Sequence, residues 1–172
     1  LAKKYECQFL QDDVYVTEKL DGNRCIASHD GHKWNFTSRN GKKMNVDFDM
    51  AGLFESFIYD GEVMSTEQTE LSIKRCNAIK DTTFIHCNTQ EAQLMFNKTS
   101  GLINSHGTKK ALVYNIFDII APMKYKHRRV CLDDIKKTSE DVRIVPVLYK
   151  GKDTERINKL LDTICEMGGE GI

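Results

Sequence analysis

Four residues near the start of the chain have side chains that together could support nucleophilic chemistry. Lys19, Asp21, Gly22 and Arg24 follow the apolar run Val14–Val16, whose β-branched and aromatic residues predict a strand. We expect Lys19 where this strand ends, because Asp-Gly is a turn dipeptide. An ordinary lysine has a pKa of ~10.4, so attack on an electrophile requires burial or a nearby positive charge that favours the free amine. We predict that Lys19 is a nucleophile and that Arg24 supplies such a charge.

The alternative for this stretch is a surface hairpin whose lysine makes a salt bridge. Lys-x-Asp-Gly alone occurs by chance in roughly one chain in twenty of this length, and the arginine that follows makes a chance match about twentyfold rarer. The motif therefore needs support from other parts of the chain.

The strands that would position these residues are predicted from β-branched, aromatic and alternating runs. A tight turn at Asp30-Gly31 makes the second and third a strong hairpin prediction. The predicted strands span residues 14–19, 24–28, 33–37, 57–64, 111–120 and 142–149.

The predicted helices follow from apolar residues at helical spacing. The clearest has Asp153 as its N-cap and ends at Gly168. A polar loop is expected over residues 99–110, and no chemistry is predicted for residues 65–110. The predicted helices span residues 46–54, 66–79, 88–96, 132–137 and 153–167.

Length and composition indicate one globular domain. The chain has 172 residues, 40% of them hydrophobic and 29% charged, and no apolar run approaches a membrane helix of ~18 residues. The 25 basic and 25 acidic residues balance, so any contact with a polyanion such as DNA must be local. The six cysteines form no Cys-x-x-Cys pair, which indicates reduced thiols in a cytosolic protein.

Other side chains of interest have structural alternatives. Glu62 lies in an apolar run, where a carboxylate is costly to bury without a partner, unless it faces solvent. Phe117 beside Asp118 is either a core residue or a stacking platform. The basic stretch 124–129 is either a solvated face or a phosphate contact. Cys25, His29 and His32 lack a fourth partner for zinc, so their proximity is taken as incidental.

Five short motifs in order resemble those of the covalent nucleotidyltransferases, and they are most similar to the adenylation domain of ATP-dependent DNA ligases. The resemblance runs from about residue 14 to the last residue, and five motifs in order are far more specific than one. The motifs lie at residues 19–24, 38–41, 60–62, 117–119 and 170–172.

The resemblance implies that Lys19 attacks the α-phosphate of ATP and becomes a lysine–AMP phosphoramidate. The adenylate then passes to the 5′-phosphate of nicked duplex DNA, where the 3′-hydroxyl displaces AMP. By the same resemblance, Asp21 and Gly22 support the lysine, and Arg24 and Arg39 contact ribose or phosphate.

The resemblance also implies the remaining site residues. Glu62 is expected to accept from the ribose hydroxyls, Phe117 to stack on adenine, and the backbone near Glu18 to read the adenine edge. Glu170, with Glu62 as a second carboxylate, is expected to hold Mg²⁺ or Mn²⁺. ATP is the co-substrate, nicked DNA is the partner, and a monomer without membrane contact is expected in the cytoplasm, nucleoid or nucleus.

The implied fold is α/β of the α+β type, a covalent nucleotidyltransferase or ATP-grasp-like ligase fold with mixed, mainly antiparallel sheets, flanking helices and a nucleotide cleft between them. Residues 1–172 are expected to form a C-terminally incomplete adenylation domain, since the family's Lys-x-Lys motif and OB-fold domain do not follow Ile172. Both efficient adenylation and nick sealing by the fragment alone are therefore open to question.

Three relatives within the superfamily and one separate class are alternatives. An mRNA capping guanylyltransferase shares Lys-x-Asp-Gly and a following arginine, and transfer from GTP instead of ATP would identify it. RNA ligases usually carry a different residue where Arg24 stands, and NAD-dependent ligases have an extra N-terminal domain. A non-catalytic DNA-binding module is disfavoured by the neutral charge balance.

Overall fold

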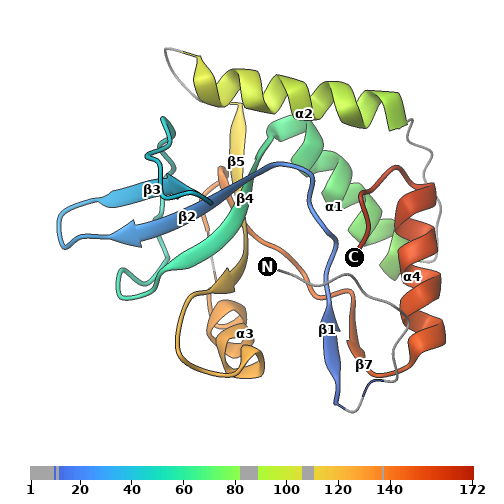
Figure 1. Ribbon diagram of the computed structural model, residues 1–172. Helices are drawn as coiled ribbons and strands as arrows, with labels where there is room; N and C mark the ends of the chain where they lie inside the picture. The colour runs from blue at the N-terminus through green and yellow to red at the C-terminus, as the bar shows by residue number, and fades with distance from the viewer. Residues whose placement is uncertain (1–9, 11, 82–88, 106–110, 137) are drawn as a thin grey trace.

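A five-stranded sheet forms the centre of the computed structural model, which describes residue 10 and residues 12–81, 89–105, 111–136 and 138–172. The strands are β2 (Asn23–His29), β3 (Trp34–Ser38), β4 (Tyr59–Ser65), β5 (Leu112–Ile119) and β6 (Val142–Ile144). Their order is β3-β2-β4-β5-β6, and every pair is antiparallel except β5 with β6 (Figure 1).

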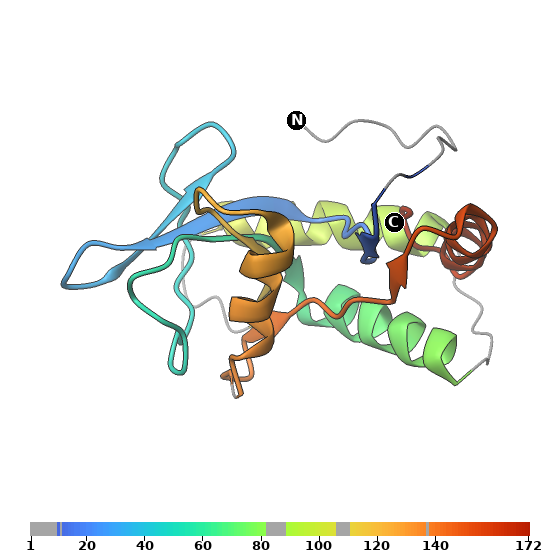
Figure 2. The ribbon, with the colours of Figure 1, turned by 90° about the horizontal axis from the view of Figure 1, so that it is seen from below.

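A separate two-stranded sheet pairs β1 (Val14–Val16) with β7 (Tyr149–Gly151) in antiparallel register. Because β1 and β2 belong to different sheets, residues 17–22 connect the two sheets and do not close a hairpin. The surface-hairpin alternative for Lys19 is therefore wrong. The C-terminal end of the chain lies beside this connection (Figures 1 and 2).

Four helices surround the sheets. They are α1 (Thr66–Lys80), α2 (Thr89–Asn104), α3 (Tyr125–Asp133) and α4 (Thr154–Glu166). The helix α1 contacts α2, α4 and strands β4 and β5, whereas α3 packs against β5. The expected α+β architecture of mainly antiparallel sheets with flanking helices is confirmed.

The main core lies against the central sheet and is rich in aromatic residues. Phe48 stacks on Tyr114 with ring centroids 5.6 Å apart, and Phe36 meets Phe48 edge to face at 5.3 Å. The Tyr114 hydroxyl is buried between the Cys25 and Tyr59 carbonyls, each 3.0 Å away, so its polar atom is satisfied. Burial raises the pKa of Tyr114 well above its usual value.

Helix α4 confirms the clearest prediction from the sequence. The Asp153 side chain accepts a hydrogen bond from the Arg156 amide at 3.1 Å, as an N-cap should. After the helix, Gly168 has a φ of 75°, a conformation that glycine adopts without strain.

The predicted helix over residues 46–54 is wrong. The described backbone there contains turns and extended chain, and alternate residues are covered by the core: Met44, Phe48 and Met50 are buried, whereas Asn45, Asp47 and Asp49 are exposed. This two-residue periodicity belongs to an extended segment packed over the core.

The polar loop predicted over residues 99–110 is also wrong in its first part, because α2 continues to Asn104. Thr99 is fully buried there, and its hydroxyl accepts from the Ser65 amide at 3.0 Å. Residues 106–110 lie outside the described residues.

The helix predicted over residues 132–137 begins earlier, at Tyr125, and includes most of the basic stretch. Its inward face carries Arg128 and Arg129 in place of apolar residues, which hid its helical periodicity. The strand predicted over residues 142–149 is split into β6 and β7, with Pro146, which has no amide hydrogen to donate, between them.

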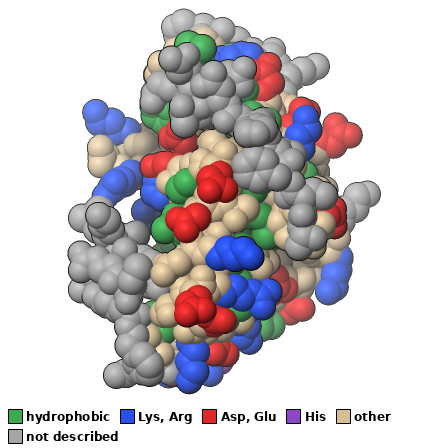
Figure 3. Space-filling view, turned by 90° about the vertical axis from the view of Figure 1, so that its right-hand side faces the viewer, with side chains coloured by type: hydrophobic (Ala, Val, Ile, Leu, Met, Phe, Trp, Pro, Cys, Tyr) green, Lys and Arg blue, Asp and Glu red, His purple; other side chains and the backbone are tan. Residues whose placement is uncertain are grey.

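The cysteine and charge patterns agree with the sequence in the described part of the chain. Cys25, Cys76, Cys131 and Cys165 are free thiols, and the other two cysteines lie outside the described residues. No described helix is long and apolar enough to cross a membrane. Acidic and basic side chains are interspersed on the face shown in Figure 3.

Candidate active site

Lys19 lies in the connection between the two sheets, with its side chain directed away from the protein interior. Its neighbours Glu18 and Leu20 are buried, whereas 53% of the Lys19 side chain is exposed. This alternation is that of extended chain, so Glu18 and Lys19 point to opposite sides.

The last residues of the chain lie next to Lys19. The Lys19 amide donates to the Gly171 carbonyl at 2.8 Å, and the Lys19 ammonium forms an ion pair with Glu170. Lys19 of the first motif and Glu170 of the last motif, which are separated by most of the chain, are thus brought together.

Gly22 allows the lysine segment to approach β4 closely. A Cβ atom at Gly22 would lie 2.5 Å from the Val63 carbonyl oxygen and 2.8 Å from Cγ of Glu62, distances that real side chains do not adopt. Arg24, on the neighbouring strand β2, is directly opposite Glu62 of β4. Any larger residue at position 22 would push the lysine segment away from β4.

Glu62 lies in a charged environment that it shares with Lys19 and Glu170. The pKa of Glu62 is raised to about 7, chiefly by burial; the charges of Asp60 and Glu170 also raise it, whereas Arg24 and Lys19 lower it. Burial and the Glu170 charge also raise the pKa of Asp21, against the effect of Lys19. Glu170 is thus paired with Lys19, and the Lys19 charge also acts on the carboxyl groups of Asp21 and Glu62.

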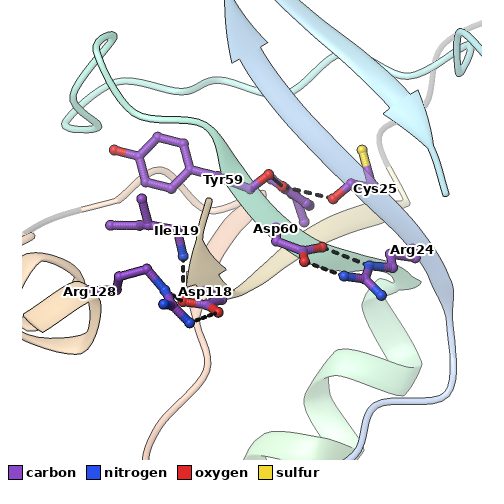
Figure 4. A network of polar contacts seen from close by, with 8 residues as sticks. Arg24, Cys25, Tyr59, Asp60, Asp118, Ile119 and Arg128 are labelled. Carbon is purple, nitrogen blue, oxygen red and sulfur yellow. Dashed lines mark hydrogen bonds and ion pairs between the residues drawn. The ribbon is translucent and has the colours of Figure 1, made fainter. Parts of the chain in front are cut away.

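Two arginine–aspartate pairs lie side by side next to this group (Figure 4). Arg24 binds Asp60 through two hydrogen bonds of 2.9 and 2.5 Å, and Arg128 binds Asp118 through two of 2.8 Å. Asp60 and Asp118 are opposite each other on β4 and β5. The hydrogen bonds that Arg24 donates to Asp60 raise the pKa of Arg24, so Arg24 is a fixed cation beside Glu62.

Phe117 is half-buried on the other side of the lysine segment. It packs against a small cluster of Leu20, Met64 and Val145, which is separate from the main core. Leu20 follows Lys19 directly, so the ring of Phe117 packs on the cluster that contains the residue next to the candidate nucleophile. The stacking role expected for Phe117 stays a prediction.

Two predicted site residues are placed differently from the others. The Glu18 carboxylate is turned away from Lys19 and is bound by Arg75, Ser72 and Cys76 of α1. Arg39 is exposed in the turn after β3, one residue beyond Ser38, which pairs with Cys25. Arg39 therefore lies near the β2 end that carries Arg24, and its contact with a nucleotide stays a prediction.

Helix α1 carries a polar face that supports the lysine segment and that was not predicted from the sequence. Gln68 donates to the Asp21 carbonyl at 2.9 Å, the Ser72 hydroxyl donates to Glu18 at 2.7 Å, and Arg75 binds Glu18 at 2.6 Å. These residues are buried at spacings of four and three, so they form one stripe. The only sign of this face in the sequence is the helical spacing of its polar residues, whose partners are distant along the chain.

Comparison with known proteins places this arrangement in a family. The sequence matches the ATP dependent DNA ligase domain over residues 2–172. The chain belongs to this family. No relative among the curated proteins matches it. The family match therefore sets aside the capping enzyme and RNA ligase alternatives.

Solved ligase structures share the fold. A Lig E DNA ligase superimposes with a TM-score of 0.66 at 21% identity, covering 99% of this chain and 58% of that one. Pmar-Lig_Pre gives 0.62 at 17% identity, covering 93% and 37%, and a mycobacterial DNA ligase D complexed with ATP and MES gives 0.54 at 13%, covering 93% and 46%. The chain thus spans little more than half the length of the first of these ligases.

Proposed function

We propose that this chain performs the lysine adenylation step of an ATP-dependent DNA ligase. The Lys19 amine attacks the α-phosphorus of ATP, a phosphorus–nitrogen bond forms, and the bond to the leaving pyrophosphate breaks. The amine must first give up its proton, and the neighbouring carboxylates Glu170, Glu62 and Asp21 are the groups placed to influence that loss. The observation that carries the proposal is the convergence of Lys19, Glu62 and Glu170 from three distant parts of the chain.

The neighbouring residues supply what a bound nucleotide requires. Glu62 can accept hydrogen bonds from two ribose hydroxyls, and Phe117 offers an aromatic face beside Leu20 for adenine. Arg24 and Arg39 are proposed to contact ribose or phosphate, Arg24 with its orientation already fixed by Asp60. The backbone near Glu18 is proposed to read the adenine edge while the Glu18 side chain holds α1.

The carboxylates around Lys19 fit a divalent cation. No group of three or more His, Cys, Asp or Glu side chains in the described part of the chain is arranged as a metal site by itself. Mg²⁺, however, commonly takes one or two protein carboxylates and completes its shell with water and phosphate oxygens. Glu170, with Glu62, would hold Mg²⁺ or Mn²⁺, which stabilises charge on the phosphate oxygens when bound.

We propose that the whole protein seals nicks in duplex DNA. The adenylate on Lys19 would pass to a 5′-phosphate, and the 3′-hydroxyl would then displace AMP. The free thiols of the four described cysteines support a reducing compartment, such as the cytoplasm or nucleoid.

Incubation of the full-length protein with α-labelled ATP and Mg²⁺ tests the adenylation step. The protein should acquire a label that survives denaturation in SDS, and Lys19→Ala should abolish it. Lys74→Ala, which removes an exposed lysine of α1, is the matched control and should label like the wild type. Equal labelling of Lys19→Ala and wild type would show that another residue is the nucleophile.

Sealing of a nicked duplex by the full-length protein tests the second part of the proposal. ATP should support sealing, whereas GTP should not. Labelling without sealing would retain the lysine chemistry and overturn the DNA substrate.

A further inference from the structure

The buried polar stripe of α1 contacts the chain on both sides of Lys19. Ser72 and Arg75 bind the Glu18 side chain, which precedes the lysine, and Gln68 binds the Asp21 carbonyl, which follows it. The oxygen of the Gln68 amide accepts from Ser65 and Thr99, so this side chain is held at both ends. One rigid helix thereby fixes both ends of a segment that has no strand pairing of its own.

Arg75 also reaches the segment that carries Glu170. Its Nε atom would lie 3.4 Å from a Cβ atom placed on Gly169, the residue before Glu170. The side chains of Glu18 and Arg75 are 0% and 9% exposed, and the pair is joined at 2.5 Å. The guanidinium therefore lies between the two chain segments whose side chains form the Lys19–Glu170 ion pair.

A third element is connected to the same group. Arg143 of β6 donates to the Ser72 hydroxyl at 3.1 Å, and Ser72 in turn donates to Glu18. Buried charges are retained only when they are paired and hydrogen-bonded, and this group meets both conditions. An apolar stripe would cover the same surface without fixing a direction, whereas hydrogen bonds fix the position of Glu18 to within a few tenths of an ångström.

We propose that Arg75 is a positioning residue for the adenylation reaction: by binding Glu18 while packing on Gly169, it sets the position of Lys19 relative to Glu170. The proposal rests on the proposed function of Lys19. Arg75 is buried against Glu18 and beside Gly169, and it acts through these two segments. Its loss should therefore slow the attack by Lys19 much more than it weakens the binding of ATP, whose adenine edge the backbone near Glu18 is proposed to read.

The decisive variant of the full-length protein replaces both charges, Glu18→Gln with Arg75→Gln, so that no buried charge is left unpaired. We expect the rate constant for AMP transfer to fall about 100-fold, as for an ångström-scale misplacement of a reacting group, and KM for ATP to change by a much smaller factor. Glu67→Gln with Lys98→Gln removes an exposed ion pair that joins α1 to α2 and should leave both constants unchanged.

A second readout does not depend on ATP. Isotope-labelled methyl groups added to the lysines by reductive methylation report the environment of Lys19 by NMR, with Lys19→Arg to assign its signal. The signal should move in the double variant towards its position in Glu170→Gln, and should not move in the control pair.

These measurements separate the two proposals. If the wild type takes up no AMP, the proposed function fails, and the NMR signal still decides whether Arg75 positions Lys19. The positioning role is overturned if the signal is unchanged, if the rate constant is unchanged, or if KM alone rises. If the double variant does not fold, Arg75→Lys takes its place, and normal transfer by that variant with an unmoved Lys19 signal would equally overturn the role of the guanidinium.

Discussion

Glu18 and Glu62 are two carboxylates near Lys19 that the protein treats in opposite ways. Glu18 is fully buried and bound by Arg75 and Ser72, so its charge is compensated within the protein. Glu62 is also largely buried, but in the described part of the chain its carboxylate has no ion pair, and its pKa rises to about 7. Glu18 therefore supports the lysine segment, whereas Glu62 has hydrogen-bonding capacity left for a ligand.

This difference shows how the fold separates support from chemistry within one short segment. The side of the lysine segment that faces α1 is hydrogen-bonded by Gln68 and Arg75, whereas on the opposite side the charge of Glu170 repels those of Asp21 and Glu62. A ligand that brings hydroxyl donors or positive charge would relieve that repulsion. Repulsion between the carboxylates destabilises the fold at the site, and the hydrogen bonds to α1 stabilise the segment that carries it.

The largest effect on stability should come from breaking the supported side. Arg75→Met leaves the Glu18 carboxylate buried without its counter-charge and should lower the free energy of unfolding by about 3–5 kcal/mol. Lys98→Met, which breaks the exposed pair with Glu67, should cost under ~1 kcal/mol. Urea unfolding of both variants measures the contrast, and similar losses would show that the Glu18–Arg75 pair is not a buried support.

A smaller, pH-dependent effect should come from Glu62. Because its folded pKa of about 7 lies above the usual 4.5, the folded protein keeps a proton that the unfolded chain releases between these values. This group therefore lowers stability as pH rises from 4.5 to about 7. Glu62→Gln removes the ionisation, and its stability relative to the wild type should rise over that range by at most about 3 kcal/mol.

Unfolding by urea in the presence of a metal chelator, at several pH values, checks this sign. Glu67→Gln, at an exposed carboxylate of α1, is the control and should show little change with pH. A Glu62→Gln variant that loses relative stability as pH rises would mean that Glu62 is paired as Glu18 is, and the contrast between the two would disappear.

The sequence was sufficient for the parts of the fold that depend on local pattern. The β2–β3 hairpin and helix α4 could be predicted because turn dipeptides, an N-cap and an apolar stripe are local signals. The motif residues Lys19, Glu62 and Glu170 could be predicted from the resemblance, and the structure brings them together.

The rest could not be predicted because the deciding partners are distant in sequence. The buried face of α1 reads as surface, since Gln68, Ser72 and Arg75 become interior residues only when Glu18 and Asp21 pack against them. The inward arginines of α3 also read as surface residues. Arg128 can be partly buried there because Asp118 accepts its hydrogen bonds. Periodicity of apolar residues cannot reveal a face whose partners are polar.

The smallest effect on stability should accompany a large effect on chemistry at Glu170. Its ion pair with Lys19 is partly exposed, at 42% for the Glu170 side chain, so Glu170→Gln should change the free energy of unfolding by under ~1 kcal/mol. AMP transfer to Lys19 should nevertheless fall about 10- to 100-fold, since a charge next to the reacting amine and a proposed metal ligand are both lost. Glu166→Gln, at an exposed carboxylate in the last turn of α4, is the matched control and should alter neither quantity. A Glu170→Gln variant that unfolds readily yet transfers AMP normally would place Glu170 with Glu18 on the supporting side, because only a structural carboxylate would give that pair of results.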